Sequence, residues 1–301
     1  MDRLLIPVGL SASGKSTFIK QNTGDMYNII STDAIREELC GNESDQSKNE
    51  EVFKLFHKRI SEGLKEGKNV CADATNINIK SRRPLIEIGK RYGAEIVCVL
   101  FVTPFESCIA RDQLRERTVG EKVITKQLRK FEVPFYEEGF DHILITSSMP
   151  KNYHTLYDTR NFYMDKAHGF DQHNPHHKYD LETHSILVAS DVYDSLNSTN
   201  MIFDGLLCHD IGKLYTQTFD DEGVAHYYNH ENVGAYKWLS DMWHEKDRLS
   251  NDVLLNNTFI INYHMRPFGW TTEKAKQKAI KTFGEEWCKV LVTVNKVDKE
   301  N

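Results

Sequence analysis

The residues with the clearest chemical potential in this sequence are the nine from Gly9 to Thr17, which read GLSASGKST. They match the spacing G-x-x-x-x-G-K-[ST] of a phosphate-binding loop, whose glycines let backbone N–H groups turn toward phosphate oxygens. Lys15 brings positive charge to the outer phosphates, and the Ser16 hydroxyl is placed to bind Mg²⁺. The pattern therefore predicts a nucleoside triphosphate site. Its expected contacts are Gly9, Ser13, Gly14, Lys15, Ser16 and Thr17.

An acid and a cation follow the second apolar run, in the sequence S-T-D-A-I-R. Asp33 at a strand end can accept a proton from an attacking hydroxyl, because a carboxylate there faces the triphosphate. Arg36, one helical turn later, can hold a phosphate of the acceptor with two hydrogen bonds. Asp33 could instead cap the helix expected over residues 34–40, and the two roles are compatible.

A second acid, Asp73, ends the third apolar run and begins the sequence D-A-T-N. An acid in this position can hold a water bound to Mg²⁺. Asn76 and the pair Arg82-Arg83 are candidates for contacts with nucleic acid or an acceptor phosphate. The arginine pair fits a solvated surface at least as well.

The basic segment of residues 109–130 contains seven basic and three acidic residues. In phosphoryl transfer, arginines on a lid over the triphosphate stabilise the charge that develops. Arg111, Arg115 and Arg117 are the candidates for this role. A solvated helix face is the alternative explanation.

The second half of the sequence carries a different set of chemical groups. Of the 13 histidines, eleven lie beyond residue 150, where acids outnumber Lys and Arg by 22 to 16. In the run L-L-C-H-D-I-G-K, the adjacent His209 and Asp210 cannot both enter an apolar core without a metal or a tight polar network. Further candidate ligands are spaced along the chain on both sides of this pair. They are His184, His230, His264 and Asp298.

The elements that position these groups differ between the two halves. Up to about residue 147, short apolar runs alternate with amphipathic stretches such as 51–65 and 82–92, which favours an α/β domain with a parallel sheet and flanking helices. The polar stretch 41–49 is expected to be a loop. The expected strands are 3–8, 27–31, 69–73, 95–102 and 142–146.

From residue 181 onward strand signals vanish, and the pattern predicts an all-α domain. The predicted organisation is a kinase domain over 1–149, a linker and lead-in over 150–172, and a second domain over 173–301. The expected helices of the second domain are 183–196, 200–209, 233–243, 254–264, 272–283 and 285–299.

The bulk composition is that of a globular protein, with 40% hydrophobic and 27% charged residues. No apolar run approaches the roughly 20 residues that span a bilayer, and the first residues do not form a signal peptide. The six cysteines are scattered without a C-x-x-C pair, which favours a reducing compartment. The expectation is a cytoplasmic protein without a membrane partner.

The GLSASGKST loop, the S-T-D-A-I-R and D-A-T-N runs and the basic segment together resemble the 5′-hydroxyl polynucleotide kinase family, including the kinase half of phage and bacterial end-healing enzymes. The resemblance covers roughly residues 1–146. It implies ATP and Mg²⁺ as cofactors, Asp33 as general base, and Arg36 as the group that grips the phosphate 3′ to the attacked hydroxyl. Arg111 matches the first lid arginine, which contacts ATP phosphates, and the second is Arg115 or Arg117.

The ordered set H…HD…H…H…D resembles the HD phosphohydrolase superfamily, specifically the HD domain attached to CCA-adding enzymes, over about residues 173–299. Lys213 would steady the phosphate, and His177 and His226 are further candidates for that contact. The implied metals are Mn²⁺, Ni²⁺ or Co²⁺, which would activate water; one or two would bind. The first implied ligand set is His184, His209, Asp210 and Asp298. The second is Asp210, His230 and His264.

The two resemblances together imply an end-healing enzyme for RNA or DNA, which phosphorylates 5′-OH ends and removes 3′-phosphate, with 2′,3′-cyclic phosphate as an extension. A ligase would be a natural partner, and the cytoplasm of a bacterium or a phage-infected host a natural setting. One alternative is a nucleoside or metabolite kinase fused to a mononucleotide phosphohydrolase. Another is a nucleotide-sensing regulator whose second domain is not catalytic. The oligomeric state stays open.

Overall fold

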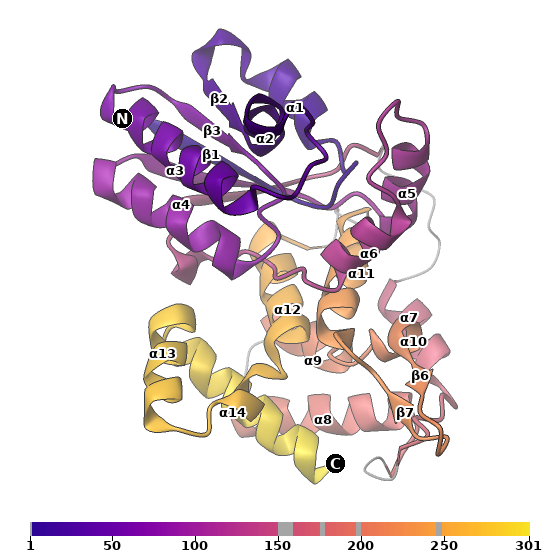
Figure 1. Cartoon of the computed structure of the whole chain (residues 1–301). Coiled ribbons are helices and arrows are strands. Elements are labelled where there is room, and N and C mark those ends of the chain that lie inside the picture. The colour runs from indigo at the N-terminus through magenta and orange to yellow at the C-terminus, as the bar shows by residue number, and fades with distance from the viewer. Residues whose placement is uncertain (1, 150–158, 175–177, 197–199, 245–248) are drawn as a thin grey trace. The chain divides into compact units, whose positions relative to one another are not determined.

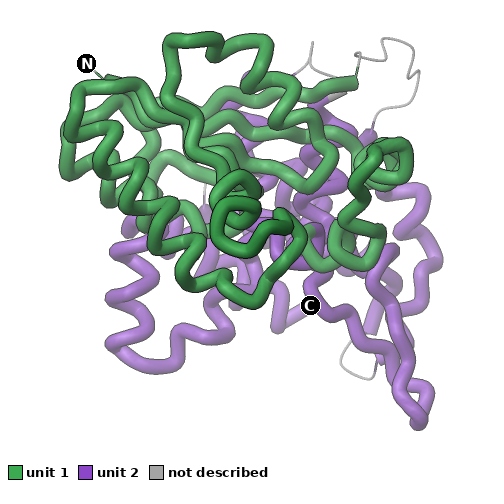
Figure 2. Tube along the Cα trace, turned by 45° about the horizontal axis from the view of Figure 1, so that its top comes forward, with its two compact units in different colours: residues 1–127, 134–149 green, residues 128–133, 150–301 purple. Residues whose placement is uncertain are grey.

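The computed structural model describes residues 2–149, 159–174, 178–196, 200–244 and 249–301. The chain forms two compact units, coloured separately in Figure 2. The first, called the α/β unit, comprises residues 1–127 and 134–149. The second, called the helical unit, comprises residues 128–133 and 150–301. The six residues 128–133, which the sequence analysis placed in the kinase domain, thus belong to the helical unit.

The α/β unit is built on a five-stranded sheet in the order β2-β3-β1-β4-β5, with all neighbouring strands parallel (Figure 1). The prediction of a parallel α/β fold is confirmed. The strands are β1 Arg3–Val8, β2 Asn28–Ser31, β3 Val70–Asp73, β4 Glu95–Phe101 and β5 His142–Thr146. The α-helices are α1 Lys15–Asn22, α2 Thr32–Cys40, α3 Asn49–Lys65, α4 Ile79–Tyr92, α5 Phe105–Gln113 and α6 Glu121–Leu128.

Helices cover both faces of this sheet because its central strands are apolar on both sides. On one face α4 approaches closely at Gly89, where a Cβ would lie 2.8 Å from Cγ1 of Ile96. On the other face Ile19 of α1 packs with Leu5 and Phe101. The carboxyl ends of β1, β2 and β3 therefore meet at one edge, where the phosphate loop, Asp33 and Asp73 follow the strands.

In the part of the chain that the structure describes, the helical unit consists mainly of α-helices with one short hairpin. Its α-helices are α7 Thr159–Ala167, α8 Leu181–Leu196, α9 Phe203–Leu207, α10 Lys213–Thr216, α11 His230–His244, α12 Asn251–Tyr263, α13 Glu273–Phe283 and α14 Glu285–Glu300. The hairpin strands are β6 Thr218–Phe219 and β7 Ala225–His226.

Two expectations for this region need correction. The hairpin contradicts the prediction of no strands after residue 181; two-residue strands are too short to show an alternating pattern. Helix α7 lies within the segment expected to be a linker and an ordered lead-in, and does not contradict that expectation; residues 150–158 are outside the described residues. The helix expected over 200–209 ends at Leu207, and the following turn carries His209.

Residues 128–133 are an integral part of the core of the helical unit. The Phe131 ring is buried and meets Tyr236 of α11 edge to face, with ring centroids 5.0 Å apart. The Val133 N–H donates to Asn262 Oδ1 at 2.6 Å, and the Tyr263 hydroxyl donates to the Val133 carbonyl at 2.7 Å. The segment is therefore fixed by both apolar packing and buried hydrogen bonds.

No helix among the described residues is long and apolar enough to span a membrane.

Candidate functional sites

The phosphate loop has the backbone shape that its glycines predict. Gly14 adopts the left-handed region, with φ of 99°, and caps the N-terminus of α1. The Lys15 Nζ donates to the carbonyl oxygens of Gly9 at 2.9 Å and Leu10 at 2.6 Å. Ser16 and Thr17 lie exposed in the first turn of α1, where free N–H groups and the helix dipole attract anions. The loop is therefore shaped to receive phosphate oxygens.

Lys15 and Asp73 influence each other's ionisation beside this loop. Burial lowers the pKa of Lys15 to about 8, although the charge of Asp73 opposes the shift. Burial raises the pKa of Asp73, and the charge of Lys15 opposes that shift in turn. The predicted acid at the end of β3 therefore lies within electrostatic reach of the phosphate loop.

Arg111 lies against the phosphate loop through a residue that the sequence analysis missed, Ser148. The Arg111 guanidinium hydrogen-bonds to the Ser148 hydroxyl and donates to the Ser148 carbonyl at 3.1 Å. The Ser148 and Thr103 hydroxyls donate to the Ser13 carbonyl at 2.9 and 2.8 Å. The ideal Cβ position of Gly14 is 3.9 Å from Arg111 Nη1. Ser148 stands in an irregular segment without a motif, so no sequence signal identified it.

Asp33 and Arg36 form an ion pair at the carboxyl end of the sheet. Arg36 Nη1 lies 2.9 Å from Asp33 Oδ1, and Arg36 Nη2 donates to Asn49 Oδ1 at 3.2 Å. The Arg36 side chain is buried, whereas the Asp33 side chain is 55% exposed, so the carboxylate is open to an incoming hydroxyl. Asp33 lies inside the first turn of α2, and the N-cap position is Ser31. Asp33 is therefore not the N-cap residue.

The structure separates the two arginines that the resemblance left as alternatives. Arg117 contacts residues 43–44 and Asp33, with Nη1 2.5 Å from Glu43 Oε1 and 3.8 Å from Asp33 Oδ2. The Arg115 side chain is exposed, and its positive charge is among the influences that lower the pKa of Lys15. The charge of Arg115 is thus within electrostatic reach of Lys15, whereas Arg117 lies beside the candidate base.

The side chains of Asn76 and Arg82 are buried, and both make contacts within the fold. Asn76 is buried, has a φ of 48°, and donates its amide to the carbonyls of Pro7 at 2.9 Å and Ala72 at 3.1 Å. Arg82 is fully buried and pairs with Glu138 at 2.7 Å. The expectation that Arg82 contacts a substrate or lies on a solvated surface is wrong, because a buried ion pair occupies its guanidinium. The Asn76 amide nitrogen joins β1 to β3.

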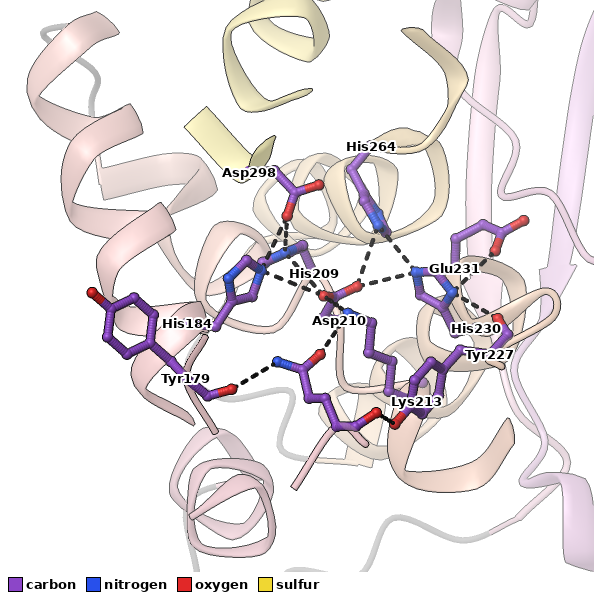
Figure 3. Close-up of polar contacts among 12 residues, drawn as sticks. Tyr179, His184, His209, Asp210, Lys213, Tyr227, His230, Glu231, His264 and Asp298 are labelled. Carbon is purple, nitrogen blue, oxygen red and sulfur yellow. Dashed lines mark hydrogen bonds and ion pairs between the residues drawn. The ribbon is translucent and has the colours of Figure 1, made fainter. Parts of the chain in front are cut away.

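In the helical unit, all six candidate metal ligands converge (Figure 3). His184 comes from α8, and His209 and Asp210 from the turn before α10. His230 begins α11, His264 directly follows α12, and Asp298 lies in the last turn of α14. The first four-residue group and the second three-residue group each have ligand atoms within 4.8 Å of one another. These groups are the two sets that the resemblance implied.

Asp210 lies at the junction of the two groups. Its Oδ2 is 3.6 Å from His184 Nε2 and 3.5 Å from His209 Nε2. Its Oδ1 is 3.0 Å from His230 Nε2 and 3.5 Å from His264 Nε2. One carboxylate thus presents a separate oxygen to each group, an arrangement that fits two cations bridged by Asp210.

Backbone carbonyls fix the orientation of three histidine rings. The Nδ1 atoms of His209, His230 and His264 lie 2.8, 2.8 and 2.9 Å from the carbonyl oxygens three residues earlier. A proton on each Nδ1 leaves the Nε2 lone pair directed into the cluster, the usual arrangement of metal-binding histidines. Within the described residues, the buried Nε2 of His209 has no hydrogen-bond partner. The donor set therefore fits a divalent metal.

Charges within this cluster are strongly coupled. Burial alone would raise the pKa of Asp210, but Lys213 and His209 outweigh burial and hold that pKa well below its ordinary value. Burial likewise opposes a low pKa at Asp298, yet His184, which is hydrogen-bonded to it, and the nearby His209 lower that pKa. Both carboxylates are thus ionised at neutral pH, as metal ligands must be.

Lys213 is held at the cluster by a residue without a sequence signal, Gln172. Lys213 Nζ lies 2.6 Å from Asp210 Oδ2 and donates to Gln172 Oε1 at 2.8 Å. The Gln172 carbonyl accepts a hydrogen bond from the Tyr227 hydroxyl at 2.7 Å. Of the two further phosphate-contact candidates, His177 lies outside the described residues, and His226 is half-buried and pairs with Asp220 at 2.9 Å.

The comparison with family models concerns the phosphate-loop half. A family model described as an AAA domain matches residues 4–134. A protein of Autographa californica nuclear polyhedrosis virus, named as a bifunctional polynucleotide kinase/RNA ligase, is 26% identical over 145 residues. The similarity covers 43% of this chain and 21% of that protein, so the chain spans about a fifth of the length of this relative.

Two solved structures are also similar to this chain. One is titled "Structure of the Pnkp1/Rnl/Hen1 RNA repair complex", with a TM-score of 0.41, 26% identity and coverage of 52% of both chains. The other is titled "Structure of Pnkp1/Rnl/Hen1 complex", with a TM-score of 0.35, 26% identity, and coverage of 52% of this chain and 50% of that one. From the family match and the viral relative, the α/β unit is a P-loop kinase-like domain with homology to a polynucleotide kinase/RNA ligase.

Proposed function

We propose that this protein heals nucleic-acid ends with two activities, an ATP- and Mg²⁺-dependent 5′-OH polynucleotide kinase and a metal-dependent 3′-phosphatase. The kinase is assigned to the α/β unit. The phosphatase is assigned to the helical unit, as a domain of the HD superfamily similar to that of CCA-adding enzymes. The observation that carries the second assignment is Asp210, whose two oxygens face two separate groups of histidines.

The kinase reaction uses groups at the carboxyl end of the sheet. The phosphate loop, Lys15 and Arg111 would hold the ATP phosphates, and Arg36 would hold an acceptor phosphate. The 5′ oxygen forms a bond to the γ-phosphorus while the bond from that phosphorus to the ADP oxygen breaks. The exposed carboxylate of Asp33 takes the hydroxyl proton.

The phosphatase reaction uses the buried cluster of the helical unit. His184, His209, Asp210 and Asp298 would hold one divalent ion, and Asp210, His230 and His264 a second. A bound ion supplies positive charge that polarises the phosphate and makes water more acidic. Lys213 adds a protein cation beside Asp210, suited to a phosphate oxygen of the 3′ end. A water oxygen bonds to phosphorus while the bond from phosphorus to the 3′ oxygen breaks, and one proton of that water ends on the 3′ oxygen, which leaves inorganic phosphate and a 3′-hydroxyl.

The two products belong together chemically. The kinase leaves a 5′-phosphate and the phosphatase leaves a 3′-hydroxyl, which are the two groups that a nucleic-acid ligase joins. The name of the viral relative combines a polynucleotide kinase with an RNA ligase, which supports RNA ends as substrates and a ligase as partner. The proposal extends to 2′,3′-cyclic phosphate ends, which the same cluster would hydrolyse.

The test uses one oligonucleotide with a 5′-OH and a 3′-phosphate, incubated with labelled ATP, Mg²⁺ and Mn²⁺. Wild type is run beside Lys15→Ala and Asp210→Ala. We expect Lys15→Ala to lose only 5′ labelling and Asp210→Ala to lose only 3′-phosphate release. If wild type does neither but phosphorylates free nucleosides, the polynucleotide function is wrong and a metabolite kinase replaces it.

A further inference from the structure

The contacts of Arg117 lie outside the phosphate loop. It lies in the connection between α5 and α6, residues 114–120, which is called the lid segment below. Its guanidinium reaches residues 43–44, in the connection between α2 and α3. This second connection, residues 41–48, is called loop 41–48 below. Arg117 therefore joins two connections whose centres are about 70 residues apart in the sequence.

The contacts of Arg117 use every nitrogen of its guanidinium. Nε donates to Ser44 Oγ at 3.0 Å, and Nη2 donates to the Glu43 carbonyl at 2.9 Å. Nη1 lies 2.5 Å from Glu43 Oε1 and faces Asp33 Oδ2 at 3.8 Å. Such a set of charge-assisted contacts fixes the plane of a guanidinium as well as its position.

The lid segment itself is held at its base by a buried acid. The Asp112 carboxylate accepts hydrogen bonds from the backbone N–H groups of Val119 at 3.0 Å and Gly120 at 2.8 Å. Asp112 is 2% exposed, so water competes little for these bonds. These hydrogen bonds join Asp112, which precedes the lid segment, to the last two residues of the segment. Arg117 thus projects from a turn whose two ends are tied together.

Two guanidiniums flank the candidate base. Arg36 faces Asp33 Oδ1 at 2.9 Å, and Arg117 faces Asp33 Oδ2 at 3.8 Å. Because each oxygen faces a different arginine, rotation of the carboxylate is opposed from both sides. A general base must hold its accepting oxygen at a fixed place relative to the hydroxyl.

We propose that Arg117, braced by Glu43, is a positioning residue of the acceptor side, which orients Asp33 and ties the lid segment to loop 41–48 next to the 5′-OH end. The inference rests on the proposed kinase function and adds a division of labour to it. Arg111 and Arg115 serve the ATP side of the reaction, and Arg36 and Arg117 serve the acceptor side. Through Arg117, the lid segment contacts Asp33 and loop 41–48 on the acceptor side.

Arg115 provides a matched control for Arg117. It lies two residues away in the same lid segment and carries the same side chain, but it is exposed and its charge acts on Lys15. A general loss of the lid would affect both variants equally. A specific acceptor role predicts that Arg117→Ala changes the kinetic parameters for the oligonucleotide, whereas Arg115→Ala changes those for ATP.

The experiment is a steady-state analysis of Arg117→Ala and Arg115→Ala, with ATP and a 5′-OH oligonucleotide varied separately. We expect Arg117→Ala to lower kcat/KM for the oligonucleotide by about tenfold to a hundredfold, with the KM for ATP within about twofold of wild type. Arg115→Ala should raise the KM for ATP instead. Arg117→Lys should recover only part of the loss, because an ammonium cannot make the forked contacts. Glu43→Gln should show a weaker form of the Arg117→Ala effect.

Nucleotide binding without acceptor gives a second readout. Titration with a fluorescent ATP analogue should give wild-type affinity in Arg117→Ala, which also shows that the variant is folded. The inference is overturned if Arg117→Ala weakens ATP binding, or if it leaves the acceptor parameters unchanged. If wild type phosphorylates nucleosides and not polynucleotides, the proposed function fails, and the same split measured with nucleosides still tests Arg117.

Discussion

The phosphate loop of the α/β unit and the histidine–aspartate cluster of the helical unit are built in opposite ways. The loop is one continuous run, and it offers backbone N–H groups whose direction depends on Gly14. The cluster gathers six side chains from along the chain between His184 and Asp298, five of them almost fully buried. The loop depends on a local backbone shape, whereas the cluster depends on distant elements packing correctly and on every charge having a partner.

The largest effect expected from this contrast is a separation of the two activities by metal. The cluster is rich in imidazole, which favours transition metals over Mg²⁺, whereas the phosphate loop requires only Mg²⁺ with ATP. After treatment with a chelator, Mg²⁺ alone should restore 5′ phosphorylation and leave 3′-phosphate release at least about a hundredfold below the level with Mn²⁺.

Thermal unfolding provides an independent measurement of the same contrast. Because Mn²⁺ binds only the folded cluster, it should raise the melting temperature of the helical unit. Asp210→Asn should remove this rise while Lys15→Ala keeps it. Full recovery of both activities with Mg²⁺ alone would show that the cluster is not a transition-metal site.

A second prediction concerns Gly212, in the turn that carries the cluster. A Cβ at this position would collide with the carbonyl oxygen of His230, the residue that begins α11. Gly212→Ala should therefore destabilise the helical unit by about 3 kcal/mol through overpacking, and weaken Mn²⁺ binding. Denaturant unfolding monitored by tryptophan fluorescence measures the loss.

Gly269→Ala is the control for this substitution, because an added Cβ there meets no atom within 4 Å. Its stability should stay within about 0.5 kcal/mol of wild type. Kinase activity should survive in both variants under conditions where the α/β unit is folded. Equal stability of Gly212→Ala and wild type would mean that α10 and α11 can separate at little cost.

The phosphate loop should show a pH dependence that comes from Lys15. Its pKa is about 8 without nucleotide, because of burial, and bound phosphates raise it by stabilising the charged form. ATP binding then takes up a proton above pH 8, so affinity is full below that pH and falls as pH rises. Between about pH 7.5 and about pH 9 we expect about a tenfold loss of affinity.

This loss is measured with a fluorescent nucleotide in buffers of constant ionic strength. The ATP phosphates are already ionised over this range, since phosphate esters lose their second proton near pH 6. Lys15→Met should bind weakly and show no such slope. A wild-type affinity that is flat over the range would mean that Lys15 keeps its proton without nucleotide.

The smallest expected effect comes from Lys213. Its Nζ lies 2.6 Å from Asp210 Oδ2, where it shares an oxygen with the first candidate metal group. A divalent ion must compete with this ammonium, so Lys213→Met should tighten Mn²⁺ binding by about fivefold, and lower the stability of the metal-free protein. Calorimetric titration with Mn²⁺ measures the affinity. Weaker binding in the variant would show that Lys213 supports the metal site instead of competing with it.

Much of the α/β unit could be predicted from the sequence, because buried parallel strands are continuous apolar runs. The observed β1 and β5 have the predicted bounds, and β4 ends one residue early, at Phe101. The hairpin of β6 and β7 could not be predicted, since its register depends on a turn in which the Asp220 N–H donates to the Val224 carbonyl and the Val224 N–H donates to the Asp220 carboxylate. Short elements of this kind are defined by contacts and not by periodicity.

The candidate sites show the same limit. His209 and Asp210 could be singled out because an adjacent imidazole and carboxylate at an apolar helix end are unusual. Arg82 was misjudged because its partner, Glu138, is 56 residues away. Gln172 and Ser148 act through hydrogen bonds from irregular segments, and such contacts leave no periodic pattern. Sequence patterns thus found the chemical groups but not the residues that brace them.

The position of residues 128–133 in the helical unit has a consequence for how the chain is made. These six residues are synthesised before β5 of the α/β unit, and more than a hundred residues before Asn262 and Tyr263, to which Val133 bonds. Until Tyr236 of α11 emerges, the Phe131 ring lacks this apolar partner and is a target for chaperones or aggregation. A gene cut at residue 149 would remove Phe131 from the helical fragment, so the two units cannot be exchanged as simple consecutive cassettes.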